Sequence, residues 1–111
     1  MNQKSNWVIK NHTIEGDWAF VEKDGSTYLE FADNFKTDPG PDVKVYLAKK
    51  DINDIDKHES VDLEGFFLGE MHEFTGKHQF KIKAGINLDD FISVVIHCKK
   101  YSVVWGGANI K

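Results

Sequence analysis

Apolar and polar side chains alternate along much of this chain, which is the pattern of β-strands that bury one face. In one such segment Val43, Val45 and Leu47 alternate with Lys44 and Tyr46. The first three side chains are therefore expected to face a core, and the other two are expected to face outward. This spacing predicts a half-buried strand.

A second segment predicts a β-hairpin from two signals that agree. The dipeptide DG at residues 24–25 is a favoured two-residue turn, because glycine readily adopts the positive φ that the turn requires. Counting outward from that turn, Phe20 faces Leu29 and Trp18 faces Phe31. These four apolar side chains fall on one face, so the turn and the hydrophobic pattern indicate the same register.

The pattern in the rest of the chain predicts short strands joined by loops. Residues 78–83 alternate again, whereas residues 34–42 contain two prolines and form a loop. Residues 49–62 are polar and acidic, and we expect a long connection there with one helical turn. A second helical turn is expected at residues 86–91, where Asn87 is a suitable N-cap.

Together these segments predict an all-β protein with about eight short strands and at most one or two helical turns. The expected architecture is an antiparallel β-sandwich or a flattened barrel. At 111 residues the chain is long enough for one hydrophobic core and is expected to form a single domain over residues 1–111.

Charge and composition exclude several functions. The net charge is −4, and all 14 basic residues are lysines. Without excess positive charge or arginine, a nucleic-acid partner is not expected. No apolar run approaches the roughly 18 residues of a transmembrane helix, and residues 1–10 lack the features of a signal peptide.

Signatures of hydrolytic enzymes are missing, so we predict a protein that is not an enzyme. His72 and Glu73 are followed by Gly76 where a zinc-protease helix would need a second histidine. No cofactor is predicted. The candidate ligands for haem or a metal are His72 and His78, which could approach each other across a loop, together with Met71. The alternative is that these histidines are exposed polar side chains beside a turn.

Cys98 is the sole cysteine and lies between two apolar runs. In a strand its side chain shares a face with Val94 and Ile96, whereas the adjacent His97 points to the other face. If that shared face belongs to the core, the thiol is a small buried hydrophobic group, as free cysteines commonly are.

The alternative is that Cys98 has a redox role. Lys99 and Lys100 follow it directly and could stabilise a thiolate, and Tyr101 is close in sequence. A thiol redox cycle needs a second sulfur or a metal. Since this chain has no other cysteine, that sulfur would have to come from a partner. The solvent exposure of Cys98 therefore separates a redox role from a packing role.

Three blocks of the sequence carry a family resemblance: residues 39–47, 78–82 and 94–110, with Phe35 before the first block and His12 near the start of the chain. In this order and spacing they resemble the DM-thirteen domain, also called the electron-transfer DM domain, over residues 12–110. The positions that fit the family's turn and tail are Gly40, Pro41, Asp42, Cys98, Tyr101, Trp105, Gly106 and Ala108.

The resemblance implies an all-β extracellular or periplasmic module with a role in electron transfer, in which Cys98 is the redox residue and an unidentified protein is the redox partner. The rival hypothesis is an extracellular binding or adhesion module with a structural Cys98. In that case the loop at residues 39–42, the acidic connection and exposed aromatics such as Tyr46 would form the recognition surface.

Overall fold

The computed structural model describes residues 4–55, 65–98 and 103–110. These residues form ten strands and two single-turn 3-10 helices, which confirms the all-β prediction. The elements are β1 (Val8–Ile9), β2 (Ile14–Glu15), β3 (Trp18–Lys23), β4 (Ser26–Phe31), β5 (Lys36–Thr37), β6 (Val43–Ala48), η1 (Ile52–Asp54), β7 (Phe66–Glu70), β8 (His78–Ile82), η2 (Leu88–Asp90), β9 (Ser93–Cys98) and β10 (Val103–Asn109).

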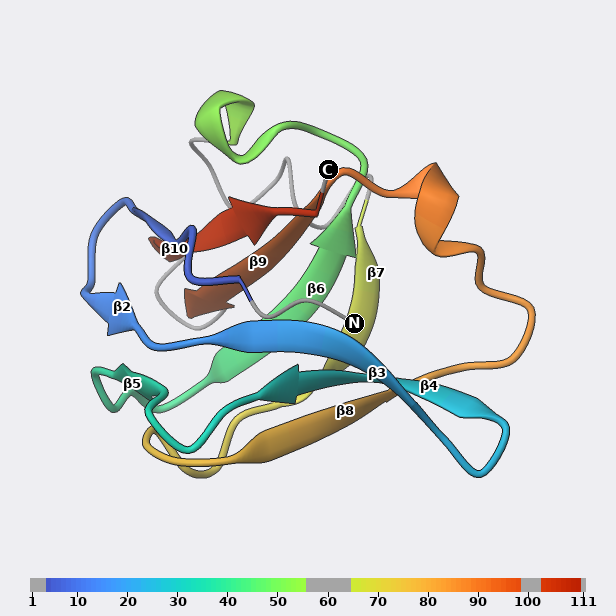
Figure 1. Cartoon of the computed structure of the whole chain (residues 1–111). Coiled ribbons are helices and arrows are strands. Elements are labelled where there is room, and N and C mark those ends of the chain that lie inside the picture. Colours follow the sequence, from blue (N-terminus) through green and yellow to red (C-terminus); the bar gives the residue numbers. More distant parts are fainter. Residues whose placement is uncertain (1–3, 56–64, 99–102, 111) are drawn as a thin grey trace.

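Two antiparallel sheets make up the body of the domain (Figure 1). The larger sheet has the order β1-β10-β9-β6-β7, and the smaller one has the order β3-β4-β8. Strands β2 and β5 form a separate two-stranded ribbon at one end. Within the described residues the sheets do not close into a barrel, so the sandwich is the correct one of the two predicted architectures.

The predicted hairpin is present with the predicted register. Phe20 pairs with Leu29, and Trp18 pairs with Phe31. Both residues of the turn adopt positive φ, 53° at Asp24 and 82° at Gly25. This is the left-handed geometry that matches the twist of two antiparallel strands.

The main hydrophobic core lies between the two sheets. Trp18, Leu29 and Phe31 from the smaller sheet are at most 1% exposed, and so are Val45 and Leu47 from the larger sheet. These side chains belong to one continuous cluster. The inward face that alternation predicted for β6 is therefore correct.

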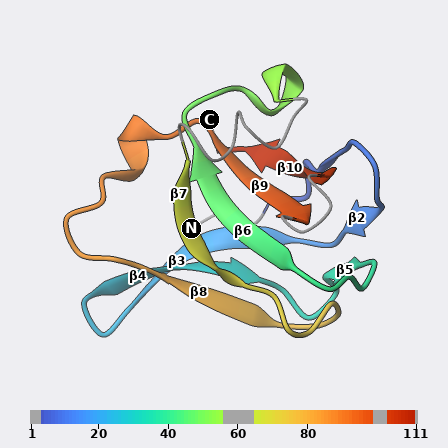
Figure 2. The ribbon, with the colours of Figure 1, turned by 180° about the vertical axis from the view of Figure 1, so that it is seen from behind.

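The outer face of the larger sheet is also buried, and here the prediction from the sequence is wrong. Tyr46 was expected to be exposed, but it is only 7% exposed. It packs in a second cluster with Val95 and Val104, and with Ile52 and Ile55 at and just after η1. Figure 2 shows η1 beside the larger sheet, on the side of β10, and it contacts β9 and β10. Because β6 is an inner strand of a sheet whose outer face is also covered in part by η1, alternation could not reveal burial on both sides.

The loops and turns between the strands match the predictions from the sequence in part. Asn87 caps η2, where its side-chain oxygen accepts a hydrogen bond from the Asp89 amide. The turn η1 lies in the predicted acidic connection, and residues 56–62 of that connection lie outside the described residues. Strand β5 corrects the prediction of an uninterrupted loop at residues 34–42, because Lys36 and Thr37 pair with β2.

Candidate functional site

Cys98 ends strand β9 on the inner face of the larger sheet. Its side chain is 2% exposed and packs in the main core with Val94 and Ile96, as strand alternation predicted. His97 is fully buried in the opposite face, where its ring centroid lies 4.6 Å from that of Tyr46. Although His97 was a candidate neighbour of the thiol, it lies on the side of the sheet away from it.

A small, mostly apolar pocket of about 190 Å³ lies against Cys98. Two positions of the turn motif predicted from the family resemblance, Gly40 and Pro41, help to form it. The complete lining is His12, Pro39, Gly40, Pro41, Cys98, Val103 and Trp105. The cysteine is thus buried in the core and also forms part of a pocket wall.

A β-bulge in β10 supplies the aromatic wall of this pocket. Val104 pairs with His97 and Gly106 pairs with Ile96, so Trp105 is the additional residue between them. A bulge reorients the side chain of the extra residue, and bulges are frequent beside functional sites. Here the bulge directs Trp105 into the inner core, where the side chain is 2% exposed.

The same bulge positions His12. The backbone carbonyl of Trp105 accepts hydrogen bonds from the amides of Lys10 at 2.9 Å and Asn11 at 3.1 Å, and from that of His12 at 3.4 Å. This brings the imidazole of His12 onto the indole of Trp105, with ring centroids 4.4 Å apart. The imidazole Nδ1 lies 3.0 Å from Oδ2 of Asp38. His12 is thus fixed by a ring contact and by a carboxylate.

Gly40 permits the close contact between the turn and the indole. A Cβ atom at this position would lie 2.8 Å from the Cζ2 atom of Trp105 and 3.1 Å from a methyl group of Val43. Any larger residue would push the turn away from the ring and reshape the pocket. The third residue of the motif, Asp42, does not line the pocket.

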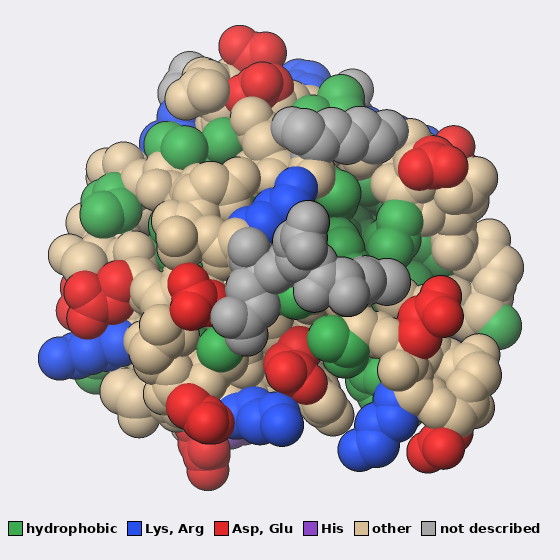
Figure 3. Space-filling view, in the orientation of Figure 1, with side chains coloured by type: hydrophobic (Ala, Val, Ile, Leu, Met, Phe, Trp, Pro, Cys, Tyr) green, Lys and Arg blue, Asp and Glu red, His purple; other side chains and the backbone are tan. Residues whose placement is uncertain are grey.

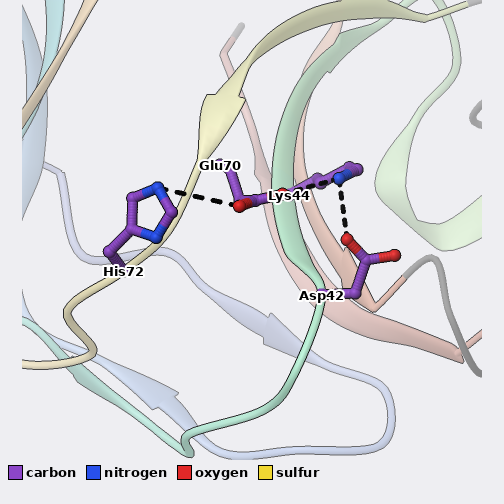
Figure 4. Close-up of polar contacts among 4 residues, drawn as sticks. All are labelled: Asp42, Lys44, Glu70 and His72. Carbon is purple, nitrogen blue, oxygen red and sulfur yellow. Dashed lines mark hydrogen bonds and ion pairs between the residues drawn. The ribbon is translucent and has the colours of Figure 1, made fainter.

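Asp42 instead takes part in a polar cluster on the outer face (Figure 4). The ammonium group of Lys44 donates to Asp42 at 2.7 Å and to Glu70 at 2.8 Å. These two carboxylates raise the pKa of Lys44 well above its usual range. Glu70 also contacts His72, with 3.6 Å between Oε2 and Nε2.

The other predicted site residues lie in different surroundings. His72 is 78% exposed, the ring of His78 packs against Phe80 at 5.2 Å, and Met71 is buried in the main core. Among residues 4–55, 65–98 and 103–110, no group of three or more His, Cys, Asp or Glu side chains could hold a metal ion. The predicted neighbours of the thiol, Lys99, Lys100 and Tyr101, lie outside the described residues.

A larger hollow of about 520 Å³ lies at the other end of the smaller sheet, between the hairpin turn at residues 25–27 and residues 81–88. It contains none of the site residues predicted from the sequence. Its ionisable lining groups are Lys81 and Lys83, so it offers no carboxylate, thiol, imidazole or aromatic ring. The pocket at Cys98 combines a thiol, an imidazole and an indole, and is therefore the stronger candidate.

The sequence indicated Cys98 and the turn, but it did not predict that His12, Asp38 and Trp105 lie together. A signal for Trp105 and His12 was present, because both fitted the family resemblance. Nothing in the local pattern indicated that Asp38 would contact His12. The two residues are separated by 26 positions and meet through the packing of two loops.

The fold and site define an antiparallel β-sandwich domain with a thiol at a small aromatic pocket. Comparison with known families gives a match to the family described as Electron transfer DM13 over residues 8–110. The chain therefore belongs to this family, as the sequence blocks suggested. Neither a search of curated proteins nor a search of solved structures gave a match.

In the orientation of Figure 3, acidic and basic side chains are interspersed, and this face carries no large patch of one sign. None of the helices in the described segments is long and apolar enough to cross a bilayer.

Proposed function

We propose that this protein is a non-enzymatic electron-transfer module of the cell envelope in which the Cys98 thiol is the redox group. Family membership supports the electron-transfer role. The observation that carries the redox assignment is the position of Cys98 in the wall of the pocket formed by the turn at residues 39–41 and Trp105. A small reactant in this pocket would lie beside the cysteine without unfolding the core.

The chemistry that fits a single cysteine is exchange with a disulfide of the partner. The Cys98 thiolate attacks one sulfur of that disulfide, the S–S bond breaks, and the other sulfur leaves as a thiolate. Cys98 is then held in a mixed disulfide, and a second thiol releases it by the reverse reaction. The partner supplies every other sulfur in this cycle.

The test measures alkylation of the native protein by iodoacetamide between pH 6 and pH 9, with mass spectrometry as the readout. The proposal predicts that Cys98 is modified under native conditions, and that Cys98→Ser removes the modification. The same measurement in denaturant gives the rate for a fully accessible thiol. A thiol that reacts only in denaturant would overturn the redox assignment.

The second candidate is a binding or adhesion module in which Cys98 is structural. The observation that favours it is the 2% exposure of Cys98 and its packing against Val94 and Ile96. The recognition surface would then be the loop at residues 39–42 and its surroundings, without Tyr46, which is buried. This candidate predicts that Cys98→Ala retains partner binding, whereas Gly40→Ala weakens it.

A further inference from the structure

We infer that His12, oriented by Asp38, is the proton acceptor that activates the Cys98 thiol. This inference rests on the proposed redox function and identifies how that site would work. A buried thiol is a poor nucleophile, because the thiolate is the reactive form and an apolar environment disfavours it. A base on the same pocket would overcome this barrier.

Cys98 and His12 line one pocket from opposite ends of the sequence. The cysteine comes from the end of β9, and the histidine comes from the loop held by the Trp105 carbonyl. Within the described part of the chain, no hydrogen bond occupies the Cys98 sulfur. The thiol and the imidazole therefore border the same pocket without a direct hydrogen bond, so a water in the pocket would have to carry the proton between them.

The contact with Asp38 determines which nitrogen of His12 can act. A neutral imidazole with Nδ1 at 3.0 Å from a carboxylate donates its Nδ1 proton to that carboxylate. The lone pair then resides on Nε2, which is the nitrogen free to accept a proton. The tilted contact with the indole of Trp105, at 37° between the ring planes, limits the orientation of the imidazole. An oriented base held by a third group is the usual means of activating a cysteine.

The remaining charged groups around the pocket leave His12 as the available base. Only His12 and Cys98 are ionisable among the residues that line it. Asp38 contacts His12, and Asp42 of the same turn is held by Lys44.

The resulting step is balanced in protons and electrons. Nε2 of His12 takes the thiol proton through a water in the pocket, and the thiolate attacks one sulfur of a small disulfide. That S–S bond breaks, a new bond joins Cys98 to the attacked sulfur, and the second sulfur leaves with the electron pair. The protonated imidazole then returns its proton to the leaving thiolate or to solvent.

The experiment follows the reaction of the native protein with 4,4′-dithiodipyridine, a small neutral disulfide whose released thiopyridone is detected by absorbance. The rate is measured from about pH 5 to pH 9, and the wild-type profile is expected to differ from that of a variant without the His12 imidazole. In His12→Gln the rate should fall about 100-fold or more at pH 7, which is the lower end of a general-base contribution. The rate that remains should increase only at a more alkaline pH than in the wild-type protein, because the thiol must then ionise without the base.

Three further variants separate this role from a structural one. Asp38→Asn is expected to lower the rate at neutral pH by a smaller factor, because the base remains but loses its orienting carboxylate. Added imidazole should restore the rate of His12→Gly and leave the wild-type rate unchanged. The matched control His78→Gln removes a histidine that does not line the pocket and should retain the wild-type profile.

The possible results distinguish the proposed role of His12 from the proposed redox role of Cys98. If Cys98 reacts in the native protein but His12→Gln keeps the wild-type pH profile, the role of His12 is overturned and the redox assignment stands. If Cys98 does not react in the native wild-type protein, both are overturned. Thermal unfolding of each variant checks that a lost rate does not reflect a lost fold.

Discussion

Cys98 and His97 are adjacent in β9 and equally hidden from solvent, yet their surroundings differ. The side chain of Cys98 belongs to the core between the sheets and reaches the end of that core, where loops form a pocket. His97 lies on the outer face, against the ring of Tyr46. Burial alone therefore does not distinguish the two residues.

The difference lies in what borders each face. On the inner face the strand pairing of β9 and β10 ends near Cys98, and the turn at residues 39–41 and His12 border the opening. On the outer face a second apolar cluster continues across the sheet to η1. A thiol becomes a candidate site when the core beside it ends in loops that carry polar groups.

The largest expected effect tests whether the inner and outer faces of the larger sheet are both covered by a hydrophobic core. Val94 and Val95 are neighbouring residues on opposite faces, and both are 0% exposed. Val94→Ala and Val95→Ala should each lower the free energy of unfolding by about 2 kcal/mol, through lost burial and a small cavity. Urea denaturation measures both values. A change within about 0.5 kcal/mol for Val95→Ala, as is typical of a surface site, would show that the outer face is not a core.

A second prediction tests whether water reaches the Cys98 side chain. Cys98→Ser should lower the free energy of unfolding by about 1–2 kcal/mol, because a hydroxyl group is more costly to bury than a thiol. Cys98→Ala should cost less than the serine variant. Thermal and urea unfolding provide the comparison. A serine variant as stable as the wild-type protein would mean that water solvates this position through the pocket.

A third prediction separates the pocket from the rest of the fold. Gly40→Ala should cost about 1 kcal/mol through overpacking and should change the rate of Cys98 alkylation, since the added Cβ meets the indole of Trp105. The control is Gly25→Ala in the distant hairpin turn. It should cost about 1 kcal/mol, because this glycine has φ of 82°, and leave alkylation unchanged. Equal alkylation rates in both variants would contradict the assigned shape of the pocket.

The smallest effect concerns the polar cluster on the outer face. Lys44→Met removes an ammonium group whose pKa is raised by Asp42 and Glu70. A raised pKa in the folded protein stabilises it fully below the unfolded-state value of about 10.4, and this contribution is lost as the pH rises through the folded-state value. The variant should therefore lose less than about 1 kcal/mol near pH 7, with no effect on alkylation. A difference in stability that grows above pH 10.5 would contradict this assignment.

Much of the fold could be predicted because its signals are local. The hairpin required only the turn at residues 24–25 and the apolar positions beside it, and its register is as expected. The cap at Asn87 also depends on neighbours in sequence. The burial of Tyr46 could not be predicted, because it requires knowing that β6 lies between β7 and β9 and that η1 packs over the same face.

The candidate site could also be predicted only in part from the sequence. The family resemblance indicated Cys98, Gly40 and Pro41, and all three line the pocket. Two other elements of the site, the bulge at Trp105 and the contact between His12 and Asp38, depend on contacts distant in sequence. The third turn residue, Asp42, belongs to a different cluster, although it is adjacent to Pro41.

By itself the sequence determined that this is an all-β domain, that Cys98 faces the core and that His97 faces away, because side-chain direction in a strand follows from a period of two. Only the tertiary structure decided that the buried thiol borders a pocket and that His12 lies on the same pocket. That outcome depends on β1 pairing with β10 across nearly the whole chain and on one extra residue in β10. Local patterns fix the faces of strands, whereas pairing between distant segments determines which side chains meet.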